Sequence, residues 1–378
     1  MIFYGKQTLN QEDINAVVEV LKSDFLTCGP KIKEFEEKFA EYAGSKYAIA
    51  VSSGTAALHL SCLAVDLAEL DELITSPITF VASANCALYC GAKPVFADVD
   101  NNGLILVDKI KEKINSNTKI IIPVHYTGLP CDMSEIKKLA DENNLIVIED
   151  ASHALGAKYK ESKIGSCKYS DMTIFSFHPV KHITSGEGGM ITTNSKKLYD
   201  KLILLRSHGI TKSFENLINK NPEPWYHEMQ VLGFNYRITD IQCALGISQL
   251  NKIDEFIHKR RQLAQRYDSA FQNNKNIELI KENNFQINVY HLYVIKVSDS
   301  KTRLALFNYL KEQNIICQVH YIPVYWQPYY EKLGYKRKLC VNAEAFYDRI
   351  LTIPLYPALS FEDQDVIIEK INEFFDVN

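Results

Sequence analysis

The sequence lacks any cysteine pattern that would indicate a zinc site or a framework of disulfides. Its cysteines are odd in number and scattered, and none belongs to a Cys-x-x-Cys pair: Cys28, Cys62, Cys86, Cys90, Cys131, Cys167, Cys243, Cys317 and Cys340. Isolated thiols of this kind are typical of proteins kept in a reducing compartment. We therefore predict reduced cysteines, no bound metal and a cytoplasmic location.

Long blocks of like charge and long apolar runs are also missing. The chain of 378 residues has a formal net charge of −4, and the absence of a basic cluster argues against nucleic acid or a membrane as partner. Residues 1–17 are polar and charged, unlike a signal peptide. The longest uncharged stretch, residues 73–92, contains a proline and several polar residues, which favours a strand, a loop and a helix over a membrane span.

What the sequence does contain is a regular alternation of apolar runs and amphipathic segments. In the first half, runs such as residues 47–53, 72–77, 118–126 and 145–150 are expected to be strands, and segments with helical spacing separate them. Strands that are apolar on both faces and alternate with helices predict a mostly parallel sheet with helices on both sides. We therefore assign an α/β fold.

The pattern changes near residue 250. Residues 236–271 predict one long helical stretch, residues 286–297 a strand with one exposed face, and residues 316–321 a further strand. We predict a large domain over residues 1–250, with the N-terminal segment free to reach the smaller domain. Residues 251–378 are expected to form this smaller α+β domain.

The stretch FSFHPVKHITSGEGG, residues 175–189, presents Lys181 where the chain leaves an apolar strand. Lysine is rarely buried unless it is paired or takes part in chemistry. On position alone, a solvated loop lysine is the simpler interpretation. Other candidate groups alter that balance, because functional groups in open α/β sheets gather outside the carboxyl ends of the strands.

Four such groups follow strands or precede helices. The small residues SSGTAAL, residues 52–58, leave N–H groups free at a helix N-terminus, which favours phosphate but also suits a simple Ser/Thr cap. They do not form a G-x-x-x-x-G-K-[ST] loop, so ATP is not indicated. Asp150 is either a helix cap or the partner of a buried cation, and Phe80 is either a core residue or a stacking ring. Asn235 and Arg237 cap a helix or reach another subunit.

In combination, these groups suit an aromatic ring with a phosphate tail and a protonated ring nitrogen. The phosphate would bind at the Thr55–Ala56 turn with help from Ser176, and Phe80 would stack on the ring. Asp150 would keep the ring nitrogen protonated, and Lys181 would supply an amine for a Schiff base. These are the requirements of pyridoxal 5′-phosphate.

The order of these motifs resembles that of the DegT/DnrJ/EryC1/StrS sugar aminotransferases, which have the fold-type I pyridoxal-phosphate transferase architecture. The resemblance extends over nearly the whole chain, through SSGTAALHL, SPITFVASANCALYCGAKPVFADVD, VIEDASHALGAKYKESKIGS, FSFHPVKHITSGEGGMITTN, GFNYRITDIQCALGISQL and CQVHYIPVY. It implies a large, mostly parallel sheet domain, a smaller C-terminal α+β domain and a homodimer. It also implies a nucleotide-sugar substrate with L-glutamate as amino donor.

Transferred residue by residue, the resemblance makes Lys181 the Schiff-base lysine and Asp150 the partner of the ring nitrogen. His153 would lie near the ring hydroxyl, where many relatives have glutamine. Asn235 would reach across the dimer to the phosphate of the partner's cofactor. The remaining cofactor contacts it implies are Thr55, Ala56 and Ser176 at the phosphate and Phe80 on the ring.

Candidate substrate contacts come from the N-terminal segment and from the small domain. Tyr4 and Thr27 lie in the N-terminal segment that relatives use near the sugar nucleotide. His320 and Tyr321 belong to the aromatic stretch VHYIPVYWQPYY, for which a packed aromatic cluster is the alternative. Two further polar candidates are Glu187 and Arg237.

Within the family, SHALG, SFHPVKHIT, RSHGI and QVHYIPVYWQPYY most resemble aminotransferases of pseudaminic acid biosynthesis. That resemblance implies UDP-2-acetamido-2,6-dideoxy-β-L-arabino-hex-4-ulose as acceptor, with other UDP- or dTDP-linked 4-keto sugars as alternatives. A sugar dehydratase is a rival, but relatives with that chemistry replace the lysine by histidine, and here the position is Lys181, with His182 next to it. A cofactor-binding regulator is a second rival, against which the intact Lys181 and Asp150 argue.

Overall fold

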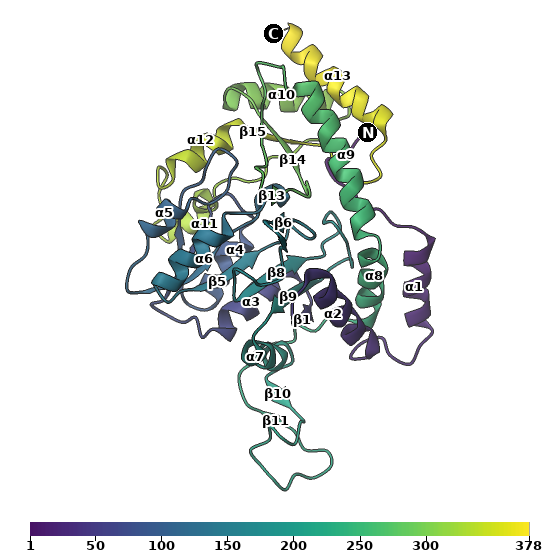
Figure 1. Cartoon of the computed structure of the whole chain (residues 1–378), viewed down its shortest axis with the longest axis vertical. Helices are drawn as coiled ribbons and strands as arrows, with labels where there is room; N and C mark the ends of the chain where they lie inside the picture. Colours follow the sequence, from purple (N-terminus) through teal and green to yellow (C-terminus); the bar gives the residue numbers. More distant parts are fainter. Residues whose placement is uncertain (378) are drawn as a thin grey trace.

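The structure, a computed structural model, describes residues 1–377. A seven-stranded sheet with the order β1-β9-β8-β5-β4-β2-β3 lies at its centre (Figure 1). The strands from β8 to β3 pair in parallel, whereas β9 is antiparallel to both β8 and β1. The prediction of a mostly parallel sheet is confirmed. The strands are β1 (Tyr47–Val51), β2 (Glu72–Thr75), β3 (Lys93–Phe96), β4 (Thr118–Ile122), β5 (Ile146–Asp150), β8 (Met172–Ser176) and β9 (Gly189–Thr193).

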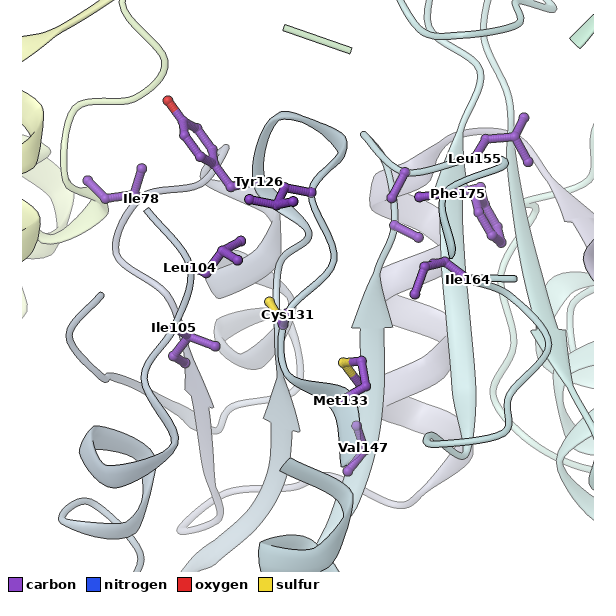
Figure 2. Close-up of a cluster of buried hydrophobic side chains, with 14 of the residues drawn as sticks. Ile78, Leu104, Ile105, Tyr126, Cys131, Met133, Val147, Leu155, Ile164 and Phe175 are labelled. Atoms are coloured by element: carbon purple, nitrogen blue, oxygen red, sulfur yellow. The ribbon is translucent and has the colours of Figure 1, made fainter. Parts of the chain in front are cut away.

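Helices cover both faces of this sheet, because successive strand residues point to opposite sides and both sides are apolar. Ile120 and Ile174 belong to one core, whereas their neighbours Ile121 and Phe175 belong to the other, part of which is shown in Figure 2. The first core packs against α3 (Gly54–Ala64), α4 (Ala82–Tyr89) and α7 (Lys196–Arg206). The second packs against α2 (Pro30–Ala43), α5 (Val107–Lys111), α6 (Met133–Glu142) and α8 (Asp240–Leu250).

A third core lies in the C-terminal part of the chain, beside a sheet with the order β12-β14-β15. In Figure 1, α9 runs from the central sheet to this part. The N-terminus also reaches it, because Ile2 forms a bridge with Ile315. Its elements are α9 (Ile253–Phe271), β12 (Glu278–Leu279), β14 (Tyr293–Lys296), α10 (Ser300–Glu312), α11 (Pro328–Lys332), α12 (Val341–Arg349), β15 (Ile350–Ile353) and α13 (Phe361–Val377).

The remaining elements are short or peripheral. The strands β10 and β11 form a two-stranded arm that projects away from the body of the molecule (Figure 1). Helix α1 packs against α8. The bounds of this group are α1 (Gln11–Leu21), the 3₁₀ turns η1 (Tyr126–Gly128) and η2 (Val324–Trp326), β6 (Lys158–Tyr159), β7 (Ser162–Lys163), β10 (Ile210–Thr211), β11 (Glu228–Met229) and β13 (Gln286–Ile287).

Three predictions for the second half were wrong. Residues 236–271 do not form one long helix, because the chain turns at residues 251–252 between α8 and α9. The sequence does not reveal this break, since both helices bury apolar residues and the apolar pattern continues through the turn. Residues 316–321 form no strand but an isolated bridge at Gln318.

Residues 286–297 form two short strands instead of one, β13 at Gln286–Ile287 and β14 at Tyr293–Lys296, and all four side chains of β14 are buried. No face is exposed, because Tyr293 and Ile295 pack in the third core while Val294 faces the second. Lys296 is buried with its Nζ 2.7 Å from the Asn101 carbonyl and 2.6 Å from Glu278.

Within residues 1–377, no helix combines the length and the apolar character needed to cross a membrane. The same residues contain no group of three or more His, Cys, Asp or Glu side chains arranged to hold a metal ion.

Candidate active site

A cavity of about 400 Å³ opens at the carboxyl ends of the central strands. Its walls come from residues that follow or end β1, β2, β4, β5 and β8, which all run in one direction. Tyr4 near the N-terminus and residues between 291 and 321 complete them. It is lined by ten of the predicted site residues: Tyr4, Thr55, Phe80, Asp150, His153, Ser176, Lys181, Glu187, His320 and Tyr321.

Four of the predicted site residues lie outside this cavity. Ala56 is buried in α3. Thr27 and Asn235 are exposed elsewhere on the chain, where Thr27 bridges to Thr239. Arg237 lines a separate hollow beside α2. In a single copy of the chain, these residues therefore have no direct access to the cavity.

The turn after β1 forms a cradle at the N-terminus of α3. Ser53 caps this helix, and its Oγ accepts a hydrogen bond from the Ala56 N–H at 3.0 Å. The N–H groups of Gly54 and Thr55 belong to the first helical turn and have no acceptor within the helix. Ser176 lies opposite, so close that a Cβ on Gly54 would come 2.9 Å from the Ser176 Cβ. Free N–H groups and a hydroxyl at a helix N-terminus suit a phosphate.

Asp150 is fixed in orientation by hydrogen bonds to both of its carboxylate oxygens. Ser83, in α4, donates its hydroxyl to Oδ2 at 2.6 Å, and the Ser152 N–H donates to Oδ1 at 3.0 Å. The Ser83 hydroxyl is also 2.7 Å from that of Thr79. Because all these groups are buried or half-buried, the carboxylate has little freedom to turn away from the cavity.

Lys181 lies in the loop that joins β8 to β9, where its N–H donates to the His178 carbonyl at 2.9 Å. Removal from water lowers the pKa of Lys181 to about 8, and the charge of Asp150 only partly opposes this shift. Near neutral pH, such an amine is in its neutral, nucleophilic form more often than a solvated lysine is.

Neutral imidazoles of the cavity wall lie near Lys181, among them those of His153, His291 and His320. Burial is the main reason that the pKa values of His153 and His291 lie well below the ordinary histidine value, and it lowers the pKa of His320 to about 3. The positive charge of Lys181 acts in the same direction on all three. The rings of His153 and His291 are 4.4 Å apart, and the Nδ1 atom of each is buried without a hydrogen-bond partner among the described residues. These rings offer hydrogen bonds rather than charge.

Aromatic side chains complete the wall. Phe80 exposes 59% of its surface, and its ring lies 6.4 Å from that of Tyr321, whose hydroxyl is 3.1 Å from His153 Nε2. Burial raises the pKa values of Tyr4 and Tyr321, which therefore remain protonated. An exposed aromatic face next to polar groups suits a flat, polar ring.

Two residues of this site were not identified from the sequence. Ser83 stands four residues after Thr79, and the turn that begins α4 brings their hydroxyls together; these two residues could have indicated a polar spot in an otherwise apolar segment. His291 lies in the apolar segment before β14, where a single histidine is more often a core residue than part of a site.

The groups around the cavity fit pyridoxal 5′-phosphate. This cofactor needs an anion site, a carboxylate for its ring nitrogen and a lysine amine, which the cradle, Asp150 and Lys181 offer within one cavity. The unpartnered Nδ1 of His153 shows that this side chain retains hydrogen-bonding capacity at the cavity wall.

Comparison with known proteins agrees with this chemistry. A sequence model of the DegT/DnrJ/EryC1/StrS aminotransferase family matches residues 7–372. The chain is 40% identical over 376 residues to UDP-4-amino-4,6-dideoxy-N-acetyl-beta-L-altrosamine transaminase of Campylobacter jejuni, covering 98% of this chain and 96% of that protein. The structure of Helicobacter pylori PseC, an aminotransferase involved in the biosynthesis of pseudoaminic acid, matches all of both chains with a TM-score of 0.93 and 33% identity. The PLP-form of Streptococcus pneumoniae Spr1654 matches with a TM-score of 0.92 at 28% identity, over 99% of this chain and 98% of that one.

Proposed function

Because the chain belongs to the DegT/DnrJ/EryC1/StrS aminotransferase family and uses pyridoxal phosphate to aminate a sugar, we propose that L-glutamate is its amino donor and a UDP-linked 4-keto-6-deoxy-N-acetyl sugar its acceptor. The specific acceptor we propose is UDP-2-acetamido-2,6-dideoxy-β-L-arabino-hex-4-ulose, aminated at C4 in pseudaminic acid biosynthesis. The relatives from C. jejuni and H. pylori support this choice. The observation that carries the proposal is that Lys181, Asp150 and the cradle line a single cavity.

Bound pyridoxal phosphate supplies an aldehyde carbon that accepts an amino group and a ring that withdraws electrons from the reacting carbon. We propose that the cradle and Ser176 hold the phosphate, that Phe80 packs on the ring, and that His153 bonds its hydroxyl. Asp150 pairs with the ring nitrogen and keeps its proton in place, which favours electron withdrawal.

Lys181 has two roles in this proposal. Its Nζ would hold the cofactor in the absence of the donor and, as a free amine, would accept a proton from the substrate carbon and return it. A pKa near 8 suits both roles, because a base that works near neutral pH must give up and regain its proton with similar ease. Burial keeps His153 and His320 neutral, whereas the charge of Asp150 favours the protonated form of Lys181.

The acceptor sugar would face the wall formed by Tyr4, His320 and Tyr321, with Glu187 at the mouth of the cavity. These side chains combine apolar rings with hydroxyl and imidazole groups, which suits the faces and hydroxyls of a sugar. His320 is held by a contact of its Nδ1 with Thr352 Oγ1 at 2.9 Å, and this leaves Nε2 as its second polar atom.

The test is to incubate the enzyme with L-glutamate and a panel of UDP- and dTDP-linked 4-keto sugars, and to identify products by mass spectrometry and NMR. We expect an amino sugar from the UDP-linked N-acetyl substrate and loss of turnover in Lys181→Ala. Lys163→Ala is the matched control, because Lys163 is also partly buried with a lowered pKa but lies outside the cavity. Preference for another keto sugar would refute the acceptor, and turnover by Lys181→Ala would refute the mechanism.

We also propose a homodimer in which Asn235 of each subunit completes the cradle of the other, with Thr27 and Arg237 acting from the same surface. The arm and its flanks support a second copy, because they expose large apolar side chains: Phe214, Ile218, Trp225, Met229 and Leu232. Apolar surface of this extent on a projecting element marks an interaction site.

Mixing two inactive variants tests the shared site. In a mixed dimer of Lys181→Ala and Asn235→Ala subunits, one of the two sites has both native residues. After random exchange of subunits, we expect roughly a quarter of wild-type activity, since half of the dimers are mixed and half of their sites are intact. No recovery in mixed dimers verified by mass spectrometry would show that Asn235 does not act across the dimer.

Finally, we propose that the chain divides into domains near residue 250, at the turn between α8 and α9. The third core supports this division, because all of its buried residues lie at Leu263 or later in the sequence. The bridge between Ile2 and Ile315 supports association of the N-terminal segment with the smaller domain.

A further inference from the structure

Arg260, in α9, is a buried cation without an anionic partner. It exposes 2% of its surface, and no carboxylate among residues 1–377 pairs with it. Burial lowers the pKa of Arg260 to about 9, so its guanidinium still carries a charge near neutral pH. A buried charge of this kind is costly unless other groups stabilise it. The proposed reaction gives it no role.

The donors of Arg260 are directed at backbone carbonyls. Its Nη1 lies 3.2 Å from the carbonyl oxygens of Tyr290 and His291, and 3.0 Å from that of Leu355. The first two carbonyls belong to the peptide groups on either side of the His291 Cα. One charged guanidinium therefore holds both of these peptide groups and fixes the backbone at His291.

The backbone at this point needs support from its surroundings. Tyr290 has a φ of 49°, a left-handed conformation that residues other than glycine rarely adopt. The carbonyl before it, that of Val289, lies 3.2 Å from Nε2 of His182, the residue that follows Lys181. Three consecutive carbonyls are thus held by two side chains, one from α9 and one from the loop that carries Lys181.

His291 lines the cavity next to His153. The centres of the two rings are 4.4 Å apart, and the Nδ1 atom of each is buried without a partner among the described residues. Nε2 of His153 is 3.1 Å from the Tyr321 hydroxyl, so Nδ1 is the atom that remains for a ligand. Because the rings are in contact, the position of His291 limits how the His153 ring can tilt.

We propose that Arg260 is a positioning residue, which acts through His291 to hold the His153 ring at the ring hydroxyl of pyridoxal phosphate. The inference rests on the proposed placement of His153 at that hydroxyl and adds the two residues that keep it there. Arg260 itself does not touch the cofactor, since its guanidinium is engaged by backbone carbonyls. Its loss would free the turn at Tyr290 and allow His291 to move away from His153.

The first experiment titrates the apoenzyme with pyridoxal phosphate and with 3-deoxypyridoxal phosphate, which lacks the ring hydroxyl. Arg260→Met should raise the Kd of pyridoxal phosphate about 5-fold, the effect of one weakened hydrogen bond, and that of the deoxy compound less than about twofold. Arg260→Lys should give a smaller loss, because a lysine keeps the charge but cannot span the carbonyls as a guanidinium does. Arg266→Met is the matched control. This second arginine of α9 contacts Gln364 and Asp365, and its loss should leave both Kd values unchanged.

The second experiment uses His291→Ala, which keeps Arg260 and removes the ring through which it acts. This variant tests the proposal even if Arg260→Met does not fold, and it should show the same selective loss of affinity for pyridoxal phosphate. The double variant Arg260→Met/His291→Ala should lose no more affinity than either single variant. The losses of His291→Ala and Ser83→Ala should instead multiply, because Ser83 acts separately through Asp150.

The proposal is overturned if His291→Ala binds pyridoxal phosphate as tightly as the wild type, or if a variant loses affinity equally for both compounds. It is also overturned if the losses of Arg260→Met and His291→Ala multiply. Equal affinity of the wild type for the two compounds would instead refute the placement of His153 itself. Since no measurement uses glutamate or a keto sugar, failure of the proposed donor or acceptor leaves these results interpretable.

Discussion

Replacing Ser83 with alanine removes the hydroxyl that donates to Asp150 Oδ2 at 2.6 Å. A hydrogen bond to a charged group contributes about 1.5–3 kcal/mol, roughly twice as much as a bond between neutral groups. The Thr79 hydroxyl, 2.7 Å from Ser83 Oγ, loses its neighbour at the same time. Among residues 1–377, the Ser152 N–H is then the one remaining donor to the Asp150 carboxylate, which is less stabilised and freer to rotate.

We expect Ser83→Ala to bind pyridoxal phosphate more weakly and to react more slowly with glutamate, because Asp150 holds the ring nitrogen in the proposed site. If about 1–2 kcal/mol of the lost energy is expressed in cofactor binding, the Kd rises about 5- to 30-fold. Titration of the apoenzyme with the cofactor, followed by quenching of protein fluorescence, measures this change. Stopped-flow absorbance with L-glutamate gives the rate of the first half-reaction.

Ser61→Ala is the matched control. Ser61 is a buried serine of α3 whose hydroxyl has no hydrogen-bond partner among the described residues, so the same atom is removed without the loss of a bond. Its melting temperature, cofactor affinity and half-reaction rate should remain close to those of the wild-type enzyme. The reasoning fails if Ser83→Ala binds the cofactor as tightly as the wild type, or if both variants lose affinity equally.

Three further predictions concern the cradle, the lysine and a buried network behind the sheet. Gly54→Ala brings a Cβ within 2.9 Å of Ser176 and so narrows the cradle. Affinity for pyridoxal phosphate should fall about 10-fold (1.4 kcal/mol), whereas affinity for pyridoxal, which lacks the phosphate, should stay nearly unchanged. Equal losses for the two compounds would contradict a phosphate cradle. Burial lowers the pKa of Lys181 to about 8, so this lysine loses its proton at lower pH than an ordinary lysine does. The rate at which the apoenzyme captures the cofactor should therefore rise from pH 7 to 9 and then level off. A midpoint of this pH profile near 10.5 would refute the lowered pKa. Glu149→Leu removes the carboxylate that contacts His125 Nε2 and accepts from the hydroxyls of Ser170 and Thr173. Urea unfolding should therefore show a loss of about 1–3 kcal/mol, and a loss below about 0.5 kcal/mol would mean that this network contributes little.

The central sheet could be predicted from the sequence because each of its strands carries its own signal. Residues such as Leu73–Thr75 and Ile146–Asp150 are buried on both faces and are followed by polar or small residues, so their type and end are visible locally. The strand at Tyr293–Lys296 lacks such a signal. Its burial depends on two separate cores that meet only in the folded chain, and Lys296 is satisfied by partners distant in sequence.

The catalytic groups of the candidate site could be predicted from the sequence, but the residue that orients them could not. Lys181 and Asp150 follow apolar strands, and parallel strands deliver their carboxyl ends to one edge, so their proximity could be inferred. The Ser83–Asp150 bond joins residues 67 positions apart, and nothing near either residue announces the other. Contacts of this kind are set by the angle at which α4 crosses the sheet, which only the packed structure determines.

The cradle follows β1, Lys181 follows β8, and Asp150 is the last residue of β5; these strands are held in one sheet with neighbouring strands about 4.8 Å apart. The opposite wall has a different support: the Leu355 N–H donates to the Tyr4 carbonyl at 3.2 Å, and the Tyr126 hydroxyl donates to the His320 carbonyl. Substitutions that reshape this wall leave the spacing of amine, carboxylate and cradle unchanged. Such an enzyme can change its acceptor sugar during evolution while its catalytic groups stay in place. Its substrate specificity and its catalytic chemistry can therefore have separate evolutionary histories.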